Sequence, residues 1–196
     1  MTEIAIETHP LEPFTPVHAK LLMLGSFPPA ESRWKMRFYY PNFQNDMWRI
    51  FGICFFNNKD YFLDLANKNF YEQRIRDFLT ETGIAIFDTA YQIKRLKGNA
   101  SDKFLEIVTP TDLDALLKKI PECTHIMTTG DKATDTLMLS MPLDAVKPSI
   151  GQSTETYFAN RTINLHRMPS SSRAYPLKLE LKAAAYQALF KDIGLL

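Results

Sequence analysis

Amides, aromatic rings and cations alternate closely in residues 25–48, which read GSFPPAESRWKMRFYYPNFQNDMW. Aromatic rings can stack on a nucleobase, cations can neutralise a phosphate, and polar groups can hydrogen-bond to the edge of a base. The segment contains a connection of about twenty residues, whereas most connections in compact domains have about 4–6 residues. Any single ring could equally well fill the core. The whole segment suits a flat, polar, anionic ligand such as a nucleotide in nucleic acid.

Short apolar runs that alternate with helical patterns are expected to position this segment. Leu21–Leu24, Ile84–Phe87 and His125–Thr128 are predicted strands, and Thr156–Ala159 with Thr162–Leu165 predict either a hairpin or one strand after a kink. Alternating strands and helices favour an α/β fold with a parallel sheet. We therefore expect a three-layer sandwich, with a central, mainly parallel four-stranded sheet and helices on both faces.

The helical patterns differ in strength. Helices are predicted near residues 46–55, 61–65, 71–82, 112–120, 132–139 and 177–190. Gly83 is a typical stop for the third helix, and Thr109 or Thr111 could cap the fourth. The last pattern is the strongest, and its apolar positions at helical spacing are Leu181, Ala184, Ala185, Ala188 and Leu189.

Two other segments have a distinct composition. Residues 1–18 are rich in proline and are expected to form an extended arm that lies on the body of a single domain, residues 1–196. Residues 92–99 are polar and basic, and their cations are Lys94, Arg95 and Lys97.

Parallel strands place their carboxyl ends at one edge of a sheet, where α/β proteins bind ligands. Four such ends are expected here, and they are Gly25-Ser26-Phe27, Asp88, Thr129-Gly130 and His166–Ser172. The sequence therefore predicts that residues far apart in the chain line a single crevice.

The composition is that of an ordinary globular protein, with 45% hydrophobic and 23% charged residues among 196. Because the net charge is only +1, any binding of nucleic acid has to come from locally placed cations. Cys54 and Cys123 have neither metal-site nor disulfide spacing, and no metal or cofactor is expected. We expect a cytoplasmic protein, because the first residues do not resemble a signal peptide and no apolar run approaches the roughly 20 residues of a membrane span. We also expect a monomer.

Four motifs occur in the order found in the uracil-DNA glycosylase superfamily. Gly25-Ser26-Phe27-Pro28, followed by Phe38-Tyr39-Tyr40, Asn42, Gln44-Asn45 and Trp48, resembles the first motif, and Met168–Ser172 resembles the second. Gly83–Asp88 and Gly130–Ala133 resemble the middle strand and the G-x-K-A turn of the deoxyinosine branch. The resemblance covers Leu21–Phe190 and is closest to the mismatch-specific and deoxyinosine (hypoxanthine) DNA glycosylases. It implies an enzyme that flips a deaminated base, hypoxanthine or uracil, out of DNA and hydrolyses its N-glycosidic bond.

Two departures from the superfamily pattern shift the expected catalytic residues. Members often carry Asp or Asn two residues after the first-motif glycine, where this chain has Phe27, and His or Asn before the Pro-Ser of the second motif, where it has Met168. The resemblance to the deoxyinosine branch therefore implies that Asn45 positions the attacking water, with Asn42 as the second candidate. Asn45 precedes a predicted helix and could also serve as its N-cap.

The same resemblance implies roles for residues that face the base. Tyr40 would stack on the flipped base, and backbone N–H groups of Ser26 and Phe27 would face the departing base. Asp88 would read the base edge, because an ionised carboxylate only accepts hydrogen bonds and N1–H of hypoxanthine or N3–H of uracil can donate one. His166 is a candidate neutral donor. Core packing for Tyr40, capping for Asp88 and a structural role for His166 are the competing explanations.

Contacts to DNA are expected from the polar loop that follows the last strand, because hydroxyls and backbone N–H groups bind phosphate without sequence preference. The candidates are Pro169, Ser170, Ser171, Ser172, Arg173 and Lys132, with Lys94, Arg95 and Lys97 as additional cations. The expected partner is DNA that contains a deaminated base.

Two alternatives to a glycosylase remain. One is a non-catalytic or weakly active DNA-binding protein of the same fold, since the first-motif acid is missing. The other is a small-molecule α/β hydrolase or nucleotide-binding enzyme, which would be expected to carry G-x-S-x-G or G-x-G-x-x-G, and neither motif occurs.

Overall fold

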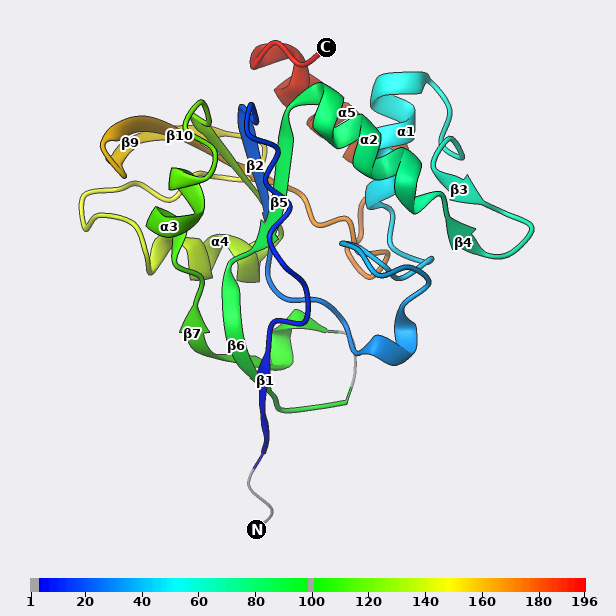
Figure 1. Ribbon diagram of the computed structural model, residues 1–196, viewed down its shortest axis with the longest axis horizontal. Coiled ribbons are helices and arrows are strands. Elements are labelled where there is room, and N and C mark those ends of the chain that lie inside the picture. The colour runs from blue at the N-terminus through cyan, green and yellow to red at the C-terminus, as the bar shows by residue number, and fades with distance from the viewer. Residues whose placement is uncertain (1–3, 99–100) are drawn as a thin grey trace.

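The computed structural model describes residues 4–98 and 101–196 and shows a central five-stranded sheet with helices on both faces (Figure 1). In spatial order the strands are β5 (Ile84–Asp88), β2 (Leu21–Gly25), β8 (His125–Thr129), β10 (Arg161–Met168) and β9 (Ser153–Phe158). The first four are parallel, and β9 runs antiparallel to β10. The α/β class and the four core strands are confirmed, but the sheet is mixed and has five strands, whereas a mainly parallel four-stranded sheet was expected.

A two-residue turn produces this fifth strand. Ala159 and Asn160 both have positive φ, at 50° and 60°, which is the backbone geometry of a type I′ turn. The turn folds β9 back on β10 and pairs Phe158 with Arg161. Of the two interpretations that the sequence allowed, the hairpin is correct.

Three helices, α1 (Met47–Phe56), α2 (Glu72–Thr82) and α5 (Leu179–Asp192), lie on one side of the sheet, and α3 (Leu113–Lys118) and α4 (Asp131–Met138) lie on the other (Figure 1). Because helices cover both faces, every residue of β2 and β5 is buried, which explains their continuous apolar runs. Two short 3-10 helices, η1 (Glu31–Arg33) and η2 (Asp102–Phe104), lie in connections. None of the helices in the described part of the chain combines the length and the apolar character needed to span a bilayer.

The ends of α2 and α3 are set by single residues. Gly83 ends α2 in the left-handed region, with φ of 79°, as predicted. The cap of α3 is Asp112, whose carboxylate accepts a hydrogen bond from the N–H of Ala115 at 3.0 Å. The predicted cap at Thr109 or Thr111 is therefore wrong, because the carboxylate nearer the helix takes this role.

The predicted short helix near residues 61–65 is also wrong. β3 (Leu63–Asp64) and β4 (Asn69–Phe70) instead form a small antiparallel hairpin. A short apolar pattern cannot distinguish one helical turn from one strand, and here the pairing of Leu63 with Phe70 decides between them.

A second sheet, of antiparallel strands, was not expected from the sequence. Its order is β1 (Ile6–Thr8), β6 (Ala90–Arg95) and β7 (Leu105–Pro110). The residues of β6 look polar and basic, and only Ala90 and Ile93 among them are buried, in a small core with Phe27 and Leu105. Asn99, the last residue of the predicted basic stretch, lies outside the described residues.

The N-terminal arm is part of these sheets. β1 pairs with β6, and Phe14 forms an antiparallel bridge with Ile86 at the edge strand β5. Between these two anchors, the backbone N–H of His9 donates to the carbonyl of Tyr91 at 2.8 Å. The arm therefore does more than lie on the body, because it covers a sheet edge and brings His9 into the interior.

The buried face of α5 differs from the predicted one. Leu181, Ala184 and Ala188 are exposed, and the buried positions are Lys182, Ala183, Tyr186, Leu189 and Phe190. The physical reason is Lys182, whose ammonium group donates to Asp46 Oδ2 at 3.2 Å and to the carbonyl of Ser172 at 2.8 Å. With its charge paired, the carbon stem of Lys182 occupies a core position that an apolar pattern would not assign to lysine.

Candidate active site

The carboxyl ends of β2, β5, β8 and β10 meet at one edge of the sheet, as predicted. Gly25 is the register partner of Asp88, and the hydroxyl groups of Tyr40 and Thr129 are hydrogen-bonded at 2.7 Å. The N–H of Gly130 donates to the carbonyl of Met168 at 3.3 Å, which joins the end of β8 to the end of β10. Contacts therefore run without a break from Asp88 to the loop at residues 169–173, the serine loop.

Gly25 holds the central position because a side chain does not fit there. A Cβ atom on Gly25 would lie 2.5 Å from Oδ1 of Asp88 and 3.1 Å from the hydroxyl oxygen of Tyr40. The missing side chain thus lets a carboxylate and a phenol approach the same point at the end of β2.

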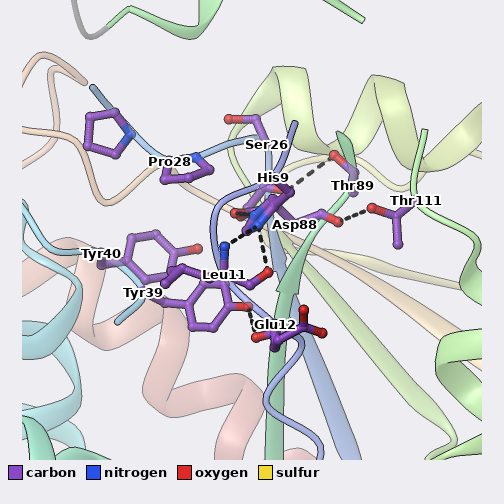
Figure 2. Close-up of polar contacts among 12 residues, drawn as sticks. His9, Leu11, Glu12, Ser26, Pro28, Tyr39, Tyr40, Asp88, Thr89 and Thr111 are labelled. Carbon is purple, nitrogen blue, oxygen red and sulfur yellow. Dashed lines mark hydrogen bonds and ion pairs between the residues drawn. The ribbon is translucent and has the colours of Figure 1, made fainter. Parts of the chain in front are cut away.

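Asp88 is buried, and its carboxylate is not free. Oδ2 accepts a hydrogen bond from Nε2 of His9 at 2.7 Å, and the backbone carbonyl of Asp88 accepts from the Thr111 hydroxyl at 2.6 Å. Figure 2 shows His9 and Asp88 between the two tyrosines, Tyr39 and Tyr40, and the pair Thr89 and Thr111. The sequence analysis missed His9, because a single histidine in a proline-rich arm, 79 residues from Asp88, carries no local signal.

Tyr40 is held in an uncommon backbone conformation, with φ of 51°, and its hydroxyl bonds to Thr129. Burial raises the pKa of Tyr40 well above its ordinary value, and the nearby charge of Asp88 raises it further. Tyr40 is therefore a neutral phenol that can donate or accept a hydrogen bond. Its ring also meets that of Trp48 edge to face, so part of the predicted core-packing role is present.

Ser26 is buried, and its hydroxyl donates to Oδ2 of Asp102 at 2.7 Å. The residue Asp102 is exposed as a whole, but its carboxyl group turns toward Ser26, and burial of that group raises its pKa. The pairing of β2 with β8 ends at Leu24 and Thr128, so the N–H of Ser26 lies beyond the last paired residues. Asp102 was not identified from the sequence, since it lies in a polar connection without a motif.

The side chain of Phe27 does not enter the site. It is buried in the small core with Ala90, Ile93 and Leu105, and its ring meets that of His9 edge to face, with centroids 5.2 Å apart. Only the backbone of Phe27 can therefore contribute to chemistry, which agrees with the role assigned to its N–H group.

Asn45 and Asn42 both hydrogen-bond to the backbone two residues further along. Oδ1 of Asn45 accepts from the N–H of Met47 at 2.9 Å, and Oδ1 of Asn42 accepts from the N–H of Gln44 at 3.0 Å. Asn45 therefore binds the first N–H of α1, but the N-cap position is Asp46, whose side chain makes no capping bond. Its carbonyl oxygen keeps a second lone pair and its amide keeps its donors, so a water can still be bound.

The serine loop is tied to the start of α1. The N–H of Asp46 donates to the carbonyl of Ser171 at 3.0 Å, and Asp46 also pairs with Arg173 and Lys182, each at 3.2 Å. The hydroxyl of Tyr186 donates to the carbonyl of Pro169 at 2.8 Å. These contacts bring Asn45 beside the loop. The sequence of neither segment indicates that the two lie together.

A cavity of about 430 Å³ opens beside this junction and not over Asp88. Its lining is formed by Asp46, Arg49, Lys59, Asp60, Arg173, Leu177, Leu179 and Lys182. Burial lowers the pKa of Arg49, and the neighbouring charge of Arg173 lowers it further. Four cations and two carboxylates surround the space, so the cavity favours an anion.

His166, Lys94 and Lys97 do not join the strand-end cluster, whereas Arg95 reaches its margin at Pro28. Nε2 of His166 bonds to Nδ1 of His125 at 3.0 Å, near the start of β8. Arg95 pairs with Glu7 and donates to the carbonyl of Pro28. The ammonium of Lys97 lies 4.2 Å from the centre of the Phe104 ring, and Lys94 lies in β6 opposite Ile6.

The buried histidine pair predicts a pH dependence of stability. Burial and, to a smaller extent, the neighbouring charge of His125 lower the pKa of His166 to about 4. An unfolded chain binds a proton at His166 below about pH 6.5, whereas the folded chain does not until about pH 4. The free energy of unfolding should thus fall by about 2 kcal/mol between pH 7.5 and 5 because of this group. Urea denaturation at both pH values should show a smaller fall in the free energy of unfolding for His166→Gln than for the wild type. An equal fall in both proteins would contradict the assignment.

Within the described residues, no group of three or more His, Cys, Asp or Glu side chains could hold a metal ion. The groups that the strand ends offer for chemistry are carboxylates, amides, hydroxyls, a phenol and backbone N–H donors.

Lys132, in the first turn of α4, is half-buried, and its positive charge favours the ionised form of Asp102, which places it near the strand ends.

Comparison with known proteins reveals a similarity of fold. No protein-family model matches the chain, and no curated protein matches it. Among solved structures, the chain is similar to a solution NMR structure described as a "putative uracil DNA glycosylase" from Methanosarcina acetivorans. The TM-score is 0.64 at 20% sequence identity, over 97% of this chain and 99% of the other. The fold expected from the superfamily resemblance is thereby supported over nearly the whole chain.

Proposed function

We propose that this protein is a monofunctional DNA glycosylase that removes a deaminated base, hypoxanthine or uracil, and leaves an abasic site. One observation carries the proposal. The fold is similar to that of the structure described as a "putative uracil DNA glycosylase". At its strand ends, Asp88, Tyr40 and the backbone of Ser26 meet beside Gly25, where a side chain would not fit. This combination of acceptor, ring and backbone donors suits a flat base that has left the DNA stack.

In this mechanism the flipped base lies against Tyr40, and Asp88 accepts a hydrogen bond from its ring N–H. Cleavage of the N-glycosidic bond leaves a cationic sugar and an anionic base, and the N–H groups of Ser26 and Phe27 would stabilise that anion. Asn45 would hold the water that adds to the sugar carbon, and the proton that this water loses would neutralise the departing base anion. Phe27 cannot take this role, because its side chain is buried in the small core.

The carboxylate of Asp88 favours hypoxanthine over uracil. Both bases present a ring N–H, but uracil has a carbonyl on each side of it, and both carbonyl oxygens would face the negative charge. Hypoxanthine has one carbonyl and one C–H beside N1–H. The electrostatic penalty is therefore smaller for the purine.

The serine loop and the neighbouring cavity would hold the DNA backbone. Arg173 is the last residue of the loop and lines the cavity, its side chain is 52% exposed, and its Nε–H bonds to Asp46. Its remaining guanidinium donors can reach a phosphate, and Ser170–Ser172 and Lys132 can add further contacts. Such contacts fix the strand without reading its sequence.

Arg173→Ala should weaken DNA binding to all sequences alike and lower the slope of log affinity against log salt by about one. The measurement is fluorescence anisotropy with hypoxanthine-containing and unmodified duplexes at several salt concentrations. Lys118→Ala is the matched control, since Lys118 lies on α3 and its ammonium group pairs with Asp114. A change in base preference with unaltered affinity would show that the role of Arg173 is misassigned.

The function is tested with oligonucleotides that carry one deoxyinosine or one deoxyuridine, in single- and double-stranded form. Alkali cuts the strand at abasic sites, so release of the base appears as a shorter product. We expect cleavage of at least one substrate and none of unmodified DNA. Binding without any cleavage would favour the alternative of a non-catalytic DNA-binding protein, which the missing acid at Phe27 also allows.

A further inference from the structure

The His9–Asp88 pair lies at the strand ends and is almost completely enclosed. Nε2 of His9 lies 2.7 Å from Oδ2 of Asp88, and the two side chains are 0% and 8% exposed. The imidazole ring is surrounded by Phe87, Phe27 and Tyr39, with centroids 4.4, 5.2 and 6.2 Å away. A polar pair in such surroundings has a defined geometry, because neither partner can turn to water.

The contacts of the other ring nitrogen of His9, Nδ1, are compatible with a hydrogen on Nε2. Nδ1 lies 3.2 Å from the N–H of Leu11 and 3.0 Å from its carbonyl oxygen (Figure 2). A neutral ring accepts from the Leu11 N–H, and a protonated ring donates to the Leu11 carbonyl. An ionised Asp88 can only accept, so the Nε2 atom opposite it carries a hydrogen and His9 donates to Asp88.

This donation leaves one oxygen of Asp88 for a ligand. Oδ2 is occupied by His9, and Oδ1 lies over Gly25 on the side of the Tyr40 hydroxyl. An ionised carboxylate only accepts hydrogen bonds, so Oδ1 is presented to a ligand as an acceptor.

We infer that His9 is a positioning residue that holds Asp88 as an acceptor-only group, and that the pair selects deaminated bases against adenine and cytosine. This inference rests on the proposed function and names the chemical change that the site recognises. Deamination of adenine converts N1 from an acceptor into an N–H donor, and deamination of cytosine does the same at N3. A fixed carboxylate oxygen accepts from the product and repels the lone pair of the parent base.

The pair would not distinguish every normal base by itself. Guanine and thymine also carry an N–H at this ring position, so their rejection has to come from other contacts. The inference concerns the separation of hypoxanthine from adenine and of uracil from cytosine.

Three DNA duplexes test it, identical except for one base that is hypoxanthine, 1-methylhypoxanthine or adenine. The methyl group removes the N1–H donor and keeps the remainder of the base. Equilibrium affinity and single-turnover base release are both measured, so that the test does not depend on cleavage. For the wild-type protein we expect hypoxanthine to be preferred by about tenfold or more over the other two.

Three variants separate positioning from general loss of structure. His9→Phe keeps a ring in the pocket but removes the donor, and it should lose most of the preference for hypoxanthine. His9→Gln can place an amide N–H near Oδ2 and should recover a substantial part of it. His18→Phe is the control, because His18 lies in the same arm and also pairs with a carboxylate, Glu122, at 2.7 Å, but in an exposed position.

The outcomes distinguish the inference from the proposed function. Cleavage of hypoxanthine DNA with an unchanged preference in His9→Phe would overturn the inference and leave the function standing. A binding preference that His9→Phe abolishes, without cleavage of any base, would support the inference and refute the enzyme. Equal wild-type affinity for hypoxanthine and adenine duplexes would overturn the inference. Thermal unfolding of each variant verifies that it is folded at the assay temperature.

Discussion

Asn45→Ala is expected to lower single-turnover release of hypoxanthine roughly 100-fold or more, with little change in DNA affinity. The reason is that the amide would hold the attacking water, an interaction needed mainly in the transition state. Asn45 lies immediately before α1 and beside the serine loop, through the bond from the Asp46 N–H to the carbonyl of Ser171. The measurement is the rate of base release with enzyme in excess, together with the affinity for the same duplex.

The structural role of Asn45 has to be separated from this catalytic one. Its side chain accepts from the N–H of Met47, so its removal should also cost about 1 kcal/mol of stability. Asn42→Ala is a matched control, because Asn42 makes the same kind of bond to the N–H of Gln44 and is also half-buried. If Asn42→Ala lost activity and Asn45→Ala did not, the second candidate would replace the first. Full activity in both variants would remove the amide from the mechanism.

Asp88→Ala should reduce base release by about 10–100-fold, which corresponds to about 1–3 kcal/mol for an unpaired donor in a closed pocket. In this variant the ring N–H of the base would have no hydrogen-bond acceptor. It would also leave Nε2–H of His9 unpaired in the interior, so the free energy of unfolding should fall by a similar amount. Base-release kinetics and urea denaturation measure the two effects separately.

Asp88→Asn is the informative comparison for this position. Its amide oxygen can still accept a hydrogen bond, but one oxygen now has to serve both His9 and the base. We expect a smaller loss of activity and of stability than in Asp88→Ala. Equal base release by the wild type and both variants would exclude Asp88 from base recognition.

The sequence by itself determined the elements that carry the site. The apolar runs at β2 and β5 are buried throughout and that at β8 is buried after its first residue, so their pattern is local and strong. Gly25, Asp88 and Gly130 mark where three of these strands end, and parallel strands necessarily bring those ends to one edge. The convergence of Tyr40, Asp88 and the serine loop could therefore be predicted without coordinates.

Tertiary structure alone decided which side chains are paired there. His9 and Asp88 are 79 residues apart, and no periodicity links a proline-rich arm to the end of a buried strand. Lys182 occupies the buried face of α5 because Asp46 and Ser172, from other segments, satisfy its charge. Phe27 turns into a core that exists only because β6 and β7 form a second sheet. Local patterns report the average environment of a segment, whereas hydrogen bonds and charge pairs depend on atoms that only the folded chain brings within about 3 Å.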